Sequence, residues 1–277
     1  MIRPDISSRL SERDWQILGT VRVFRFLTTR QLARQHFAMS DPTAVIPRSA
    51  NSALQRLRDL GLLVNLERRI GGVRAGSGGH VWQITDLANR LLVDHLGEET
   101  GPRIRPSEPS TTFLDHTLAI AELVITLQST SRHGVEIERL QLEPDCWRTY
   151  LGSAGETRTL KPDLASTSQT DGYTDFYFWE VDRATEAPNR VVRKCLQYQQ
   201  YRNTGAEQRA HGLFPAVVWV VPNKRRHDQL DRRLAAEPDV DQRLFTVIEL
   251  DQVVQLVQLG ADEFKKRTGG QEGGDPS

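Results

Sequence analysis

The sequence of 277 residues contains only two cysteines and five lysines, and no lysine precedes Lys161. Cys146 and Cys195 are too few for a disulfide framework or a four-cysteine zinc site, so we expect both to be reduced core residues. No apolar run approaches the roughly 18 residues that a membrane-spanning helix needs. The first 15 residues also lack the apolar stretch of a secretion signal. These absences favour a cytoplasmic protein without a membrane partner.

An excess charge of one sign is also missing, because 36 basic and 36 acidic residues cancel. The distribution is uneven: residues 1–82 carry 13 Arg and 6 acidic residues, about +7, so the remainder carries about −7. Such asymmetry suggests a segment that binds nucleic acid. Arginine suits bidentate contacts to phosphate and guanine. A genome of high GC content explains the excess of 31 Arg over 5 Lys equally well.

The N-terminal part predicts three helices followed by a β-hairpin. Apolar residues at helical spacing indicate a helix over 11–26, a second from residue 28 or 29, and a third over 48–60 that Gly61 ends. Two strand patterns then flank the segment 71–79, which contains five glycines. This order is typical of a winged helix-turn-helix, whose third helix enters the major groove of DNA.

On this interpretation the third helix and the hairpin loop, or wing, contact DNA. Asn, Gln and Arg can read base edges, and Arg also holds phosphates. The third helix offers Arg48, Asn51, Ser52, Gln55, Arg56 and Arg58. The wing adds Arg68, Arg69 and Arg74, which suit phosphates or the minor groove. Winged helices also serve as protein-interaction modules, but the charge of this region favours DNA.

Composition and periodicity divide the chain into four segments. We expect a winged-helix domain over 1–96, a linker with three prolines over 97–111, a second domain over 112–265 and a disordered, glycine-rich tail over 266–277. The second domain reads as a buried helix, three strands, a helix, a strand, a helix, a strand and a helix. Residues 144–156 read as a loop. This order predicts a mixed α/β sheet with helices on its faces.

Carboxylates stand at the ends of two neighbouring strand patterns in the second domain. Asp163 follows Pro162 at the first strand, and Glu180 and Asp182 end the second. Residues two apart in a strand point to the same face, so these two acids would project together. Converging acids are costly unless a cation neutralises them, and Mg²⁺ prefers oxygen ligands. A metal site is one interpretation, and exposed acids at strand ends are the other.

Two resemblances follow from these residues. Pro162-Asp163, then Glu180-Val181-Asp182, within the element order αβββαβ, resemble the PD-(D/E)XK nuclease superfamily. Over residues 10–250, segments such as LTTRQLARQHF, LKPDL, WEVDRATE and FPAVVWVVP look like the replication-relaxation family of plasmids and other mobile elements. That family is related in turn to the C class of plasmid mobilisation relaxases. The resemblance implies a protein of replication or mobilisation that binds double-stranded DNA at a plasmid origin or similar site.

The nuclease resemblance implies a metal site at the strand ends. Asp163 and Glu180 would bind Mg²⁺, and the carbonyl of Val181 would be a third ligand. Asp182 stands where the motif has its lysine, and it would bind the metal or orient a group. An Asp cannot stabilise negative charge on a phosphate as a lysine does.

The resemblance also implies how the missing charge is supplied. Lys194, on the following helix, would take the place of the motif lysine. Gln197 would orient Lys194 or contact phosphate, and a solvated position is equally compatible with its place on the helix. Relaxases often use a tyrosine nucleophile, so the attacking group stays open between water, Tyr150, Tyr198 and Tyr201.

Three classes of function remain. The first is a DNA-processing protein that nicks or relaxes DNA with Mg²⁺. The second is a non-catalytic replication accessory protein or transcriptional repressor with a degenerate nuclease fold. The third is a protein-interaction scaffold, which explains neither the arginine-rich first domain nor the clustered acids. The sequence leaves open the DNA site, the metal and the oligomeric state, including a homodimer.

Overall fold

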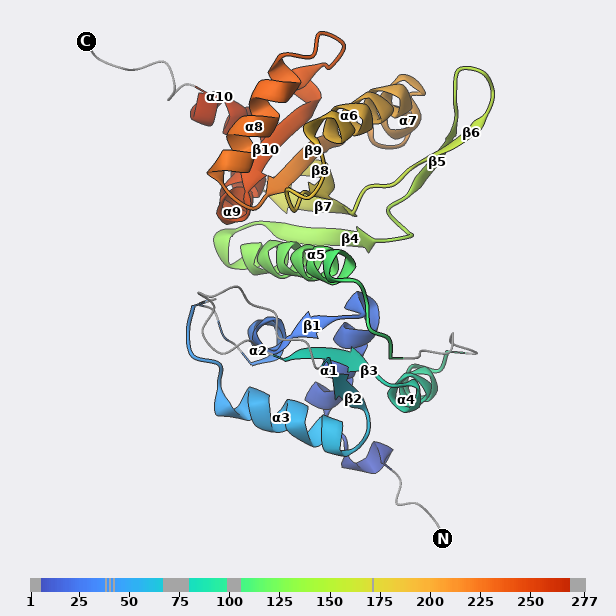
Figure 1. Cartoon of the computed structure of the whole chain (residues 1–277), viewed down its shortest axis with the longest axis vertical. Coiled ribbons are helices and arrows are strands. Elements are labelled where there is room, and N and C mark those ends of the chain that lie inside the picture. Colours follow the sequence, from blue (N-terminus) through green and yellow to red (C-terminus); the bar gives the residue numbers. More distant parts are fainter. Residues whose placement is uncertain are drawn as a thin grey trace, which may run out of the picture. The chain divides into compact units, whose positions relative to one another are not determined.

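The computed structural model describes residues 6–37, 39, 41, 43–66, 80–98, 106–170 and 172–269. The protein is of mixed α/β class, as the sequence predicts (Figure 1). Its chain divides into two compact units, Met1–Ile125 and Thr126–Ser277.

The first unit combines helices with a small antiparallel sheet. Its elements are η1 (Ser7–Arg9), α1 (Glu12–Phe24), β1 (Leu27–Thr28), α2 (Thr29–His36), α3 (Arg48–Asp59), β2 (Leu63–Asn65), β3 (Val81–Ile84) and α4 (Asp86–Leu96). The strand order is β1-β3-β2. The three helices and two later strands lie where the sequence predicts them. Strand β1 has no sequence signal, because two residues are too few to show alternation.

Capping residues set where the first two helices begin. The hydroxyl of Ser11 accepts from the N–H of Asp14, whose carboxylate accepts from the N–H of Ser11. Thr28 and Gln31 form the same reciprocal cap on α2. These contacts satisfy N–H groups that the first turn of a helix leaves unpaired. Both helices therefore begin at residues that the sequence marks.

Helix α5 (Thr111–Ser129) crosses the division between the units. Its Leu114 and Leu118 join a buried cluster of the first unit, and its Glu122 forms an ion pair with Arg34 of α2. The sequence-based boundary assigns this helix to the second domain. Most of it belongs to the first unit instead, because its apolar residues complete that unit's core.

The second unit is a five-stranded mixed sheet with helices packed against it. Its strands are β4 (Glu136–Leu142), β5 (Arg148–Leu151), β6 (Thr157–Leu160), β7 (Leu164–Thr170), β8 (Tyr173–Val181), β9 (Ala216–Val221) and β10 (Phe245–Glu249). Its helices are η2 (Thr130–His133), α6 (Pro188–Asn203), α7 (Ala206–His211), α8 (Lys224–Ala235), η3 (Gln242–Leu244), η4 (Leu250–Gln252), α9 (Val253–Leu259) and α10 (Ala261–Gly269). The order is β10-β9-β8-β7-β4, in which β8, β9 and β10 are parallel and β7 and β4 antiparallel. The predicted mixed sheet is confirmed.

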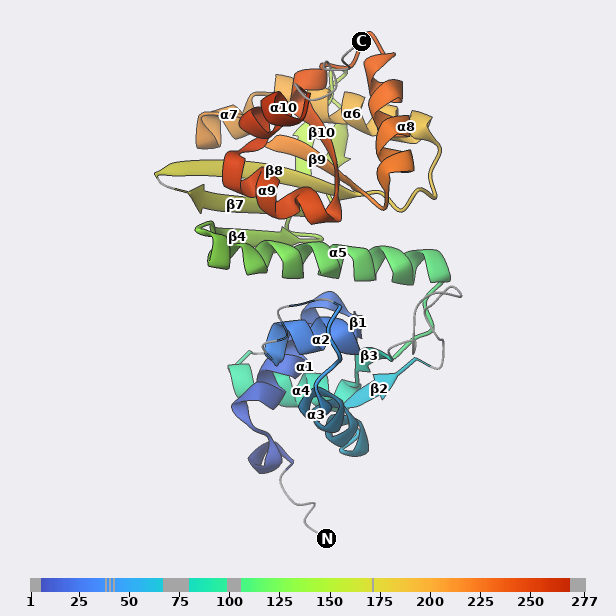
Figure 2. The ribbon, with the colours of Figure 1, turned by 90° about the vertical axis from the view of Figure 1, so that its left-hand side faces the viewer.

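Helices α6 and α8 cover one face of this sheet. Cys195 and Tyr198 of α6 and Leu230 of α8 pack with Phe178 of β8 in one buried cluster. Alternate residues of a strand share a face, so Glu180 points to the same side as Phe178. Helices α9 and α10 lie on the other side of the sheet (Figure 2).

Segment 144–156 departs from the prediction of a loop. Its residues Arg148–Leu151 form β5, which pairs with β6 as a separate two-stranded sheet. Cys146 and Tyr150 are buried in the core cluster of the α6–α8 face. Burial of these side chains outweighs the turn-forming residues around them, and local sequence shows only the latter.

The predicted tail is partly helical. Helix α10 extends to Gly269, beyond the predicted domain end at residue 265, and its Lys266 and Arg267 lie in the last turn, where cations suit the helix dipole. Residues 270–277 lie outside the described residues. At the end of the predicted linker, the N–H of Ser107 donates to the side chain of Gln83 on β3 at 3.1 Å.

Candidate functional site

The site is built around Glu180, which is 2% exposed near the end of β8. Its Oε2 accepts from Nζ of Lys194 at 2.5 Å, and its Oε1 accepts from the hydroxyl of Tyr198 at 2.6 Å. Lys194 and Tyr198 are four residues apart on α6 and therefore project from the same side of the helix. Both carboxylate oxygens of Glu180 thus have a donor.

Asp163 lies beside Glu180, immediately before β7. Its N–H donates to the carbonyl of Trp179 at 3.1 Å, and its Oδ2 accepts from the N–H of Val181 at 2.7 Å. These bonds hold the buried carboxylate of Asp163 at the end of the β7–β8 ladder, next to the pair Leu164–Trp179. We name Asp163, Glu180, Lys194 and Tyr198 the Glu180 cluster. The structure therefore brings together the two acids and the lysine that the nuclease resemblance implies.

The charges of the cluster are strongly coupled. Burial raises the pKa of Glu180 to about 7. The positive charge of Lys194 lowers this pKa, and the negative charge of Asp163 raises it further. Burial lowers the pKa of Lys194, but the Glu180 and Asp163 carboxylates outweigh it, so that the net shift is upward. Burial and the Glu180 carboxylate raise the pKa of Tyr198 well above its ordinary value. At neutral pH Lys194 is therefore charged, Tyr198 is protonated and Glu180 titrates.

Asp182 makes a different contact from the one expected. Arg226 of α8 binds its two carboxylate oxygens at 3.0 and 2.7 Å, and both side chains are buried. The N–H of Ala184 also donates to Asp182, and Arg226 donates to the carbonyl of Glu186 at 2.8 Å. The expected convergence with Glu180 relies on strand alternation, but β8 ends at Val181. Asp182 therefore fixes the loop between β8 and α6 and does not join the Glu180 cluster.

Gln197 is exposed on α6. Lys194 reaches Glu180 from α6, and the next residue on that side is Tyr198, because i and i+4 coincide better than i and i+3 in a straight helix. The expected role of Gln197 beside Lys194 has no contact to support it. The spacing of Lys194 and Tyr198 was the available sequence signal for the tyrosine.

The three candidate tyrosines have different surroundings. Tyr198 donates to Glu180. Tyr201 donates to Glu207 at 2.6 Å, and its ring lies 5.4 Å from that of Tyr150. Tyr150 and Tyr201 thus belong to the hydrophobic core on the α6–α8 face of the sheet, and neither donates to Glu180. Burial raises the pKa of Tyr201 as well, so neither it nor Tyr198 is poised to act as a phenolate.

The cluster offers two carboxylates to a metal ion. Over the residues that the structure describes, no group of three or more His, Cys, Asp and Glu side chains could hold a metal. The carbonyl of Val181 adds a backbone oxygen: its N–H faces Asp163, and the N–H and C=O of one strand residue point to the same side. This all-oxygen set matches the preference of Mg²⁺, and a cation would relieve the repulsion between Asp163 and Glu180. The types of oxygen donor present are therefore those that Mg²⁺ prefers.

Of the six α3 residues that the sequence predicts to contact DNA, only Gln55 is half-buried, but just three have side chains without a partner in the part of the chain that the structure describes. Arg48, Asn51 and Ser52 are exposed, and nothing in the described chain forms a hydrogen bond or ion pair with their side chains. The expected wing residues Arg68, Arg69 and Arg74 lie outside the described residues. Only the first half of α3 thus offers uncommitted side chains.

The polar side chains in the second half of α3 contact carboxylates of the protein itself. Arg56 binds both carboxylate oxygens of the buried Asp14 at 2.5 and 2.6 Å. Gln55 donates to Asp59 at 3.0 Å, and Arg58 lies 3.6 Å from the same carboxylate. The base-reading role expected for Arg56 competes with a structural contact to the cap of α1. Local sequence cannot show this contact, because Asp14 is distant along the chain.

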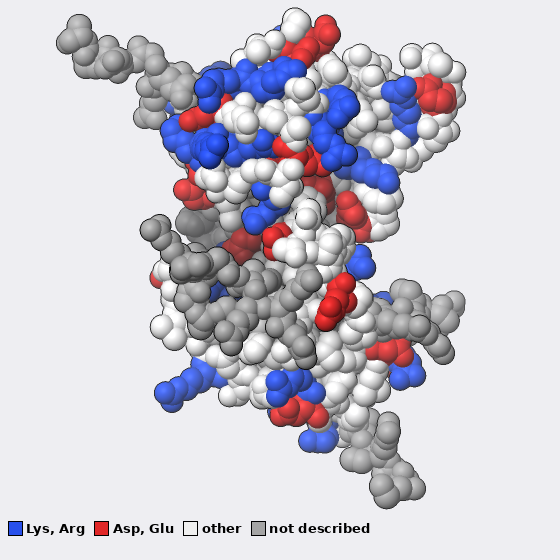
Figure 3. All heavy atoms as spheres, viewed as in Figure 1, with Lys and Arg blue, Asp and Glu red and all other residues white. Residues whose placement is uncertain are grey.

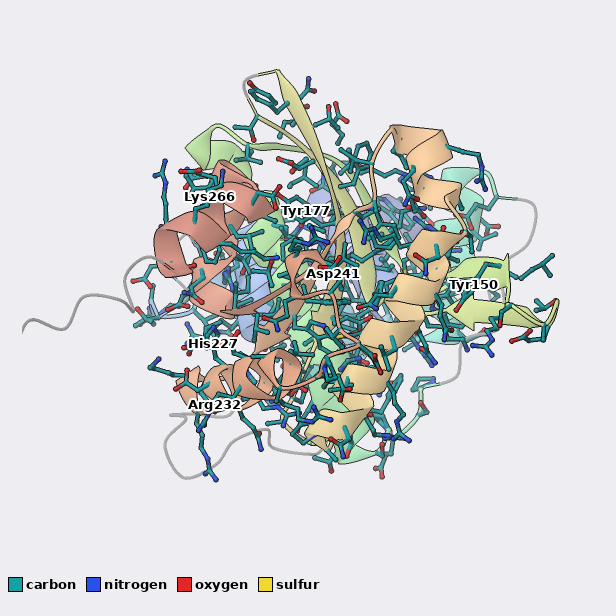
Figure 4. All side chains as sticks on the ribbon, turned by 90° about the horizontal axis from the view of Figure 1, so that it is seen from above. Tyr150, Tyr177, His227, Arg232, Asp241 and Lys266 are labelled. Carbon is teal, nitrogen blue, oxygen red and sulfur yellow. The ribbon has the colours of Figure 1, made fainter. Side chains whose placement is uncertain are left out.

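A cleft of about 870 Å³ lies elsewhere in the second unit, between α8, β10 and α10. His227 and Arg232 of α8 line it, and Figure 4 places both on the side of the unit that also carries Lys266. Neither Glu180 nor Lys194 lines this cleft. The cluster and the cleft are therefore separate features.

Fold and site together define a class: a mixed α/β protein with two compact units and a buried acid–lysine–tyrosine cluster at the sheet of the second. A family model described as replication-relaxation matches residues 18–217. The chain belongs to the replication-relaxation family. Membership points to a role in replication or mobilisation and to interaction with DNA.

Other comparisons add little. The crystal structure of protein VC1899 from Vibrio cholerae is similar with a TM-score of 0.29 and 11% identity, over 97% of this chain and 58% of that one. The chain thus spans less than two thirds of that protein, and a similarity this low carries no argument. No curated protein matches. Within the described ranges, no helix combines the length and apolarity required to cross a membrane.

Proposed function

We propose that the protein binds DNA through its first unit and cleaves a phosphodiester bond at the Glu180 cluster, during replication or mobilisation of a plasmid or other mobile element. The contact between Lys194 and Glu180, beside Asp163, carries this proposal. These are the residue types of a PD-(D/E)XK centre, with the lysine supplied by α6. The second unit would then be a variant of that nuclease fold.

The first unit supports the DNA-binding part of the proposal. Its order α1-β1-α2-α3-β2-β3 corresponds to a winged helix, in which the N-terminal residues of the third helix contact bases. Arg48 and Asn51 are exposed at that end of α3. Arg suits guanine and Asn suits adenine in the major groove.

Replacing Arg48 or Asn51 with alanine should relax the sequence preference of the protein. Each lost bidentate base contact should cost about 1–3 kcal/mol against the preferred base. Selection from a random duplex library, followed by affinity measurements, tests this. Arg90→Ala is a matched control, since Arg90 is exposed on α4 and pairs with Asp86. Identical selected sequences for all variants would argue against reading by α3.

The cluster residues would divide the chemical work. Asp163, Glu180 and the Val181 carbonyl would hold Mg²⁺, which polarises phosphate and lowers the pKa of bound water. Lys194 would leave Glu180 and stabilise charge on the phosphate. Tyr198 would keep Glu180 oriented, and its buried, protonated hydroxyl makes water the better nucleophile.

Substitutions in the cluster should abolish nicking of supercoiled plasmid in Mg²⁺ or Mn²⁺. We expect Asp163→Asn, Glu180→Gln and Lys194→Met each to lower the rate by roughly 10²-fold or more, since each removes a metal ligand or a charge-stabilising group. Gln197→Ala, on the same helix, should keep the rate of the unsubstituted protein. Equal relaxation by the protein and its Asp163→Asn variant would eliminate the metal site.

A second candidate function is non-catalytic DNA binding. Its support is that both oxygens of Glu180 already have donors, and that the cluster contributes only two carboxylates. On this view the cluster stabilises the sheet, and the protein acts as a replication accessory or repressor. It would bind DNA with a steep salt dependence and show no nicking at any metal concentration.

A further inference from the structure

Three exposed arginines are next in sequence to buried or half-buried residues in or near the Glu180 cluster. Arg183 follows β8, Arg193 lies on α6 and Arg225 lies at the start of α8, and all three are exposed. Among the residues that the structure describes, none donates a hydrogen bond to them or accepts one from them, and none forms an ion pair with them. We name these residues the three-arginine surface. Nearby Arg190 and Arg233, in contrast, are paired with carboxylates.

Buried contacts place the three arginines at one end of the sheet. Each is the sequence neighbour of a buried or half-buried charged residue: Asp182, Lys194 or Arg226. Asp182 and Arg226 bind each other, and Lys194 binds Glu180, which is two residues from Asp182. The backbone of each arginine is therefore held near the cluster, while its side chain is exposed to solvent. The arginines lie on three different segments of the chain: the loop after β8, helix α6 and the start of α8.

The wider surface is basic as well. Between residues 183 and 233 the chain has 11 basic and 4 acidic residues, although the chain after residue 82 carries a net charge of about −7. Figure 3 shows basic side chains gathered over α8 and α6 of the second unit. The fold thus collects positive charge on one face of an acidic part of the chain. The distribution of charge along the sequence, in contrast, assigns the excess of positive charge to residues 1–82 alone.

We propose that the three-arginine surface binds the sugar–phosphate backbone of DNA alongside the Glu180 cluster. This inference rests on the proposed function. Unpaired guanidinium groups bind phosphate in a bidentate manner without first breaking an internal ion pair. Phosphate contacts position the nucleic acid and carry no sequence information. The surface would therefore hold any DNA sequence next to the cluster, while α3 selects the site.

The test compares two triple variants of the full chain. One carries Arg183→Gln, Arg193→Gln and Arg225→Gln. The control carries Arg158→Gln, Arg243→Gln and Arg267→Gln, which remove the same charge from exposed but ion-paired arginines of the second unit. Both are first checked for an unchanged Tm. Where the triple variant folds poorly, the three single variants replace it.

The measured quantity is duplex affinity over a series of salt concentrations. Each phosphate contact adds about 0.9 to the slope of log K against log salt, so the triple variant should have a slope shallower by roughly 2–3, and each single variant by roughly 1. The sequence preference should not change, and the control slope should equal that of the unsubstituted protein. Equal slopes for both triple variants would overturn the proposal.

Two further readouts separate this proposal from the proposed function. If the arginine variants have no effect while Arg48→Ala and Asn51→Ala relax sequence preference, only the three-arginine surface is refuted. The cleavage proposal fails and the surface stands if the arginine variants change the slope while the unsubstituted protein does not nick DNA. The same holds if the unsubstituted protein nicks DNA no faster than its Asp163→Asn variant. Polyglutamate of equal charge should compete poorly with DNA. Equal competition would assign the surface to an acidic polypeptide and overturn the proposal.

Discussion

Replacing Arg226 with methionine is expected to lower the free energy of unfolding of the second unit by about 3–5 kcal/mol, because it leaves the buried carboxylate of Asp182 without a cation. Both side chains are almost inaccessible to solvent, and Arg226 donates to both oxygens of Asp182. Urea unfolding followed by hydrogen exchange of β8 and α8 peptides would assign the loss to this unit. It would be among the largest effects of any single substitution in the chain.

The double variant Arg226→Met with Asp182→Asn is the matched control. It removes the unpaired charge together with its partner, so most of the lost stability should return. Exposed ion pairs contribute about 0–1 kcal/mol to stability. If Arg226→Met alone lowered the free energy of unfolding by less than about 1 kcal/mol, the ion pair between Arg226 and Asp182 would not be buried.

The same substitution should disturb the loop that leads to α6. Ala184 lies in this loop with φ of 57°, in the left-handed region that residues other than glycine seldom adopt. Its N–H donates to Asp182. The ion pair thus holds a strained turn before the helix that carries Lys194. Loss of DNA nicking in Arg226→Met with DNA binding intact would follow from this positioning.

The stability of the protein relative to its Glu180→Gln variant is expected to fall by about 3 kcal/mol between pH 4.5 and 7. Burial raises the pKa of Glu180 from 4.5 to about 7 in the folded state, and each unit of pKa is worth about 1.4 kcal/mol. In this window the folded state keeps a proton that the unfolded state has released, so rising pH favours unfolding. The difference should be constant above pH 7.

Urea unfolding in chelator-treated buffer, at intervals of half a pH unit, measures this difference. Lys194→Met should extend the decline beyond pH 7, because the ammonium group is what holds the pKa of Glu180 down. Gln197→Ala, an exposed change on the same helix, should follow the profile of the unsubstituted protein. Parallel profiles for the protein and Glu180→Gln would show that Glu180 is not buried in its acidic form.

Local sequence predicted most elements of both units. Ser11 and Thr28 mark helix starts by their own hydrogen bonds, alternation marks β4, and a short apolar run marks β8. It failed for β5, whose Tyr150 owes its extended conformation to burial against α6. It also failed for the boundary at α5, where the core of the first unit extends into a helix that the linker sequence separates from it.

By itself the sequence determined most of the longer elements, the mixed α/β class, the family resemblance and the candidates Asp163, Glu180 and Lys194. These depend on caps, periodicity and short motifs, which act over a few residues. Only the tertiary structure decided that Asp182 pairs with Arg226, that Tyr198 completes the cluster and that exposed, unpaired arginines lie near it. Those contacts join β8 to helices 14 to 44 residues away. Which side chains meet over such separations depends on how the helices pack on the sheet, and local patterns do not encode that.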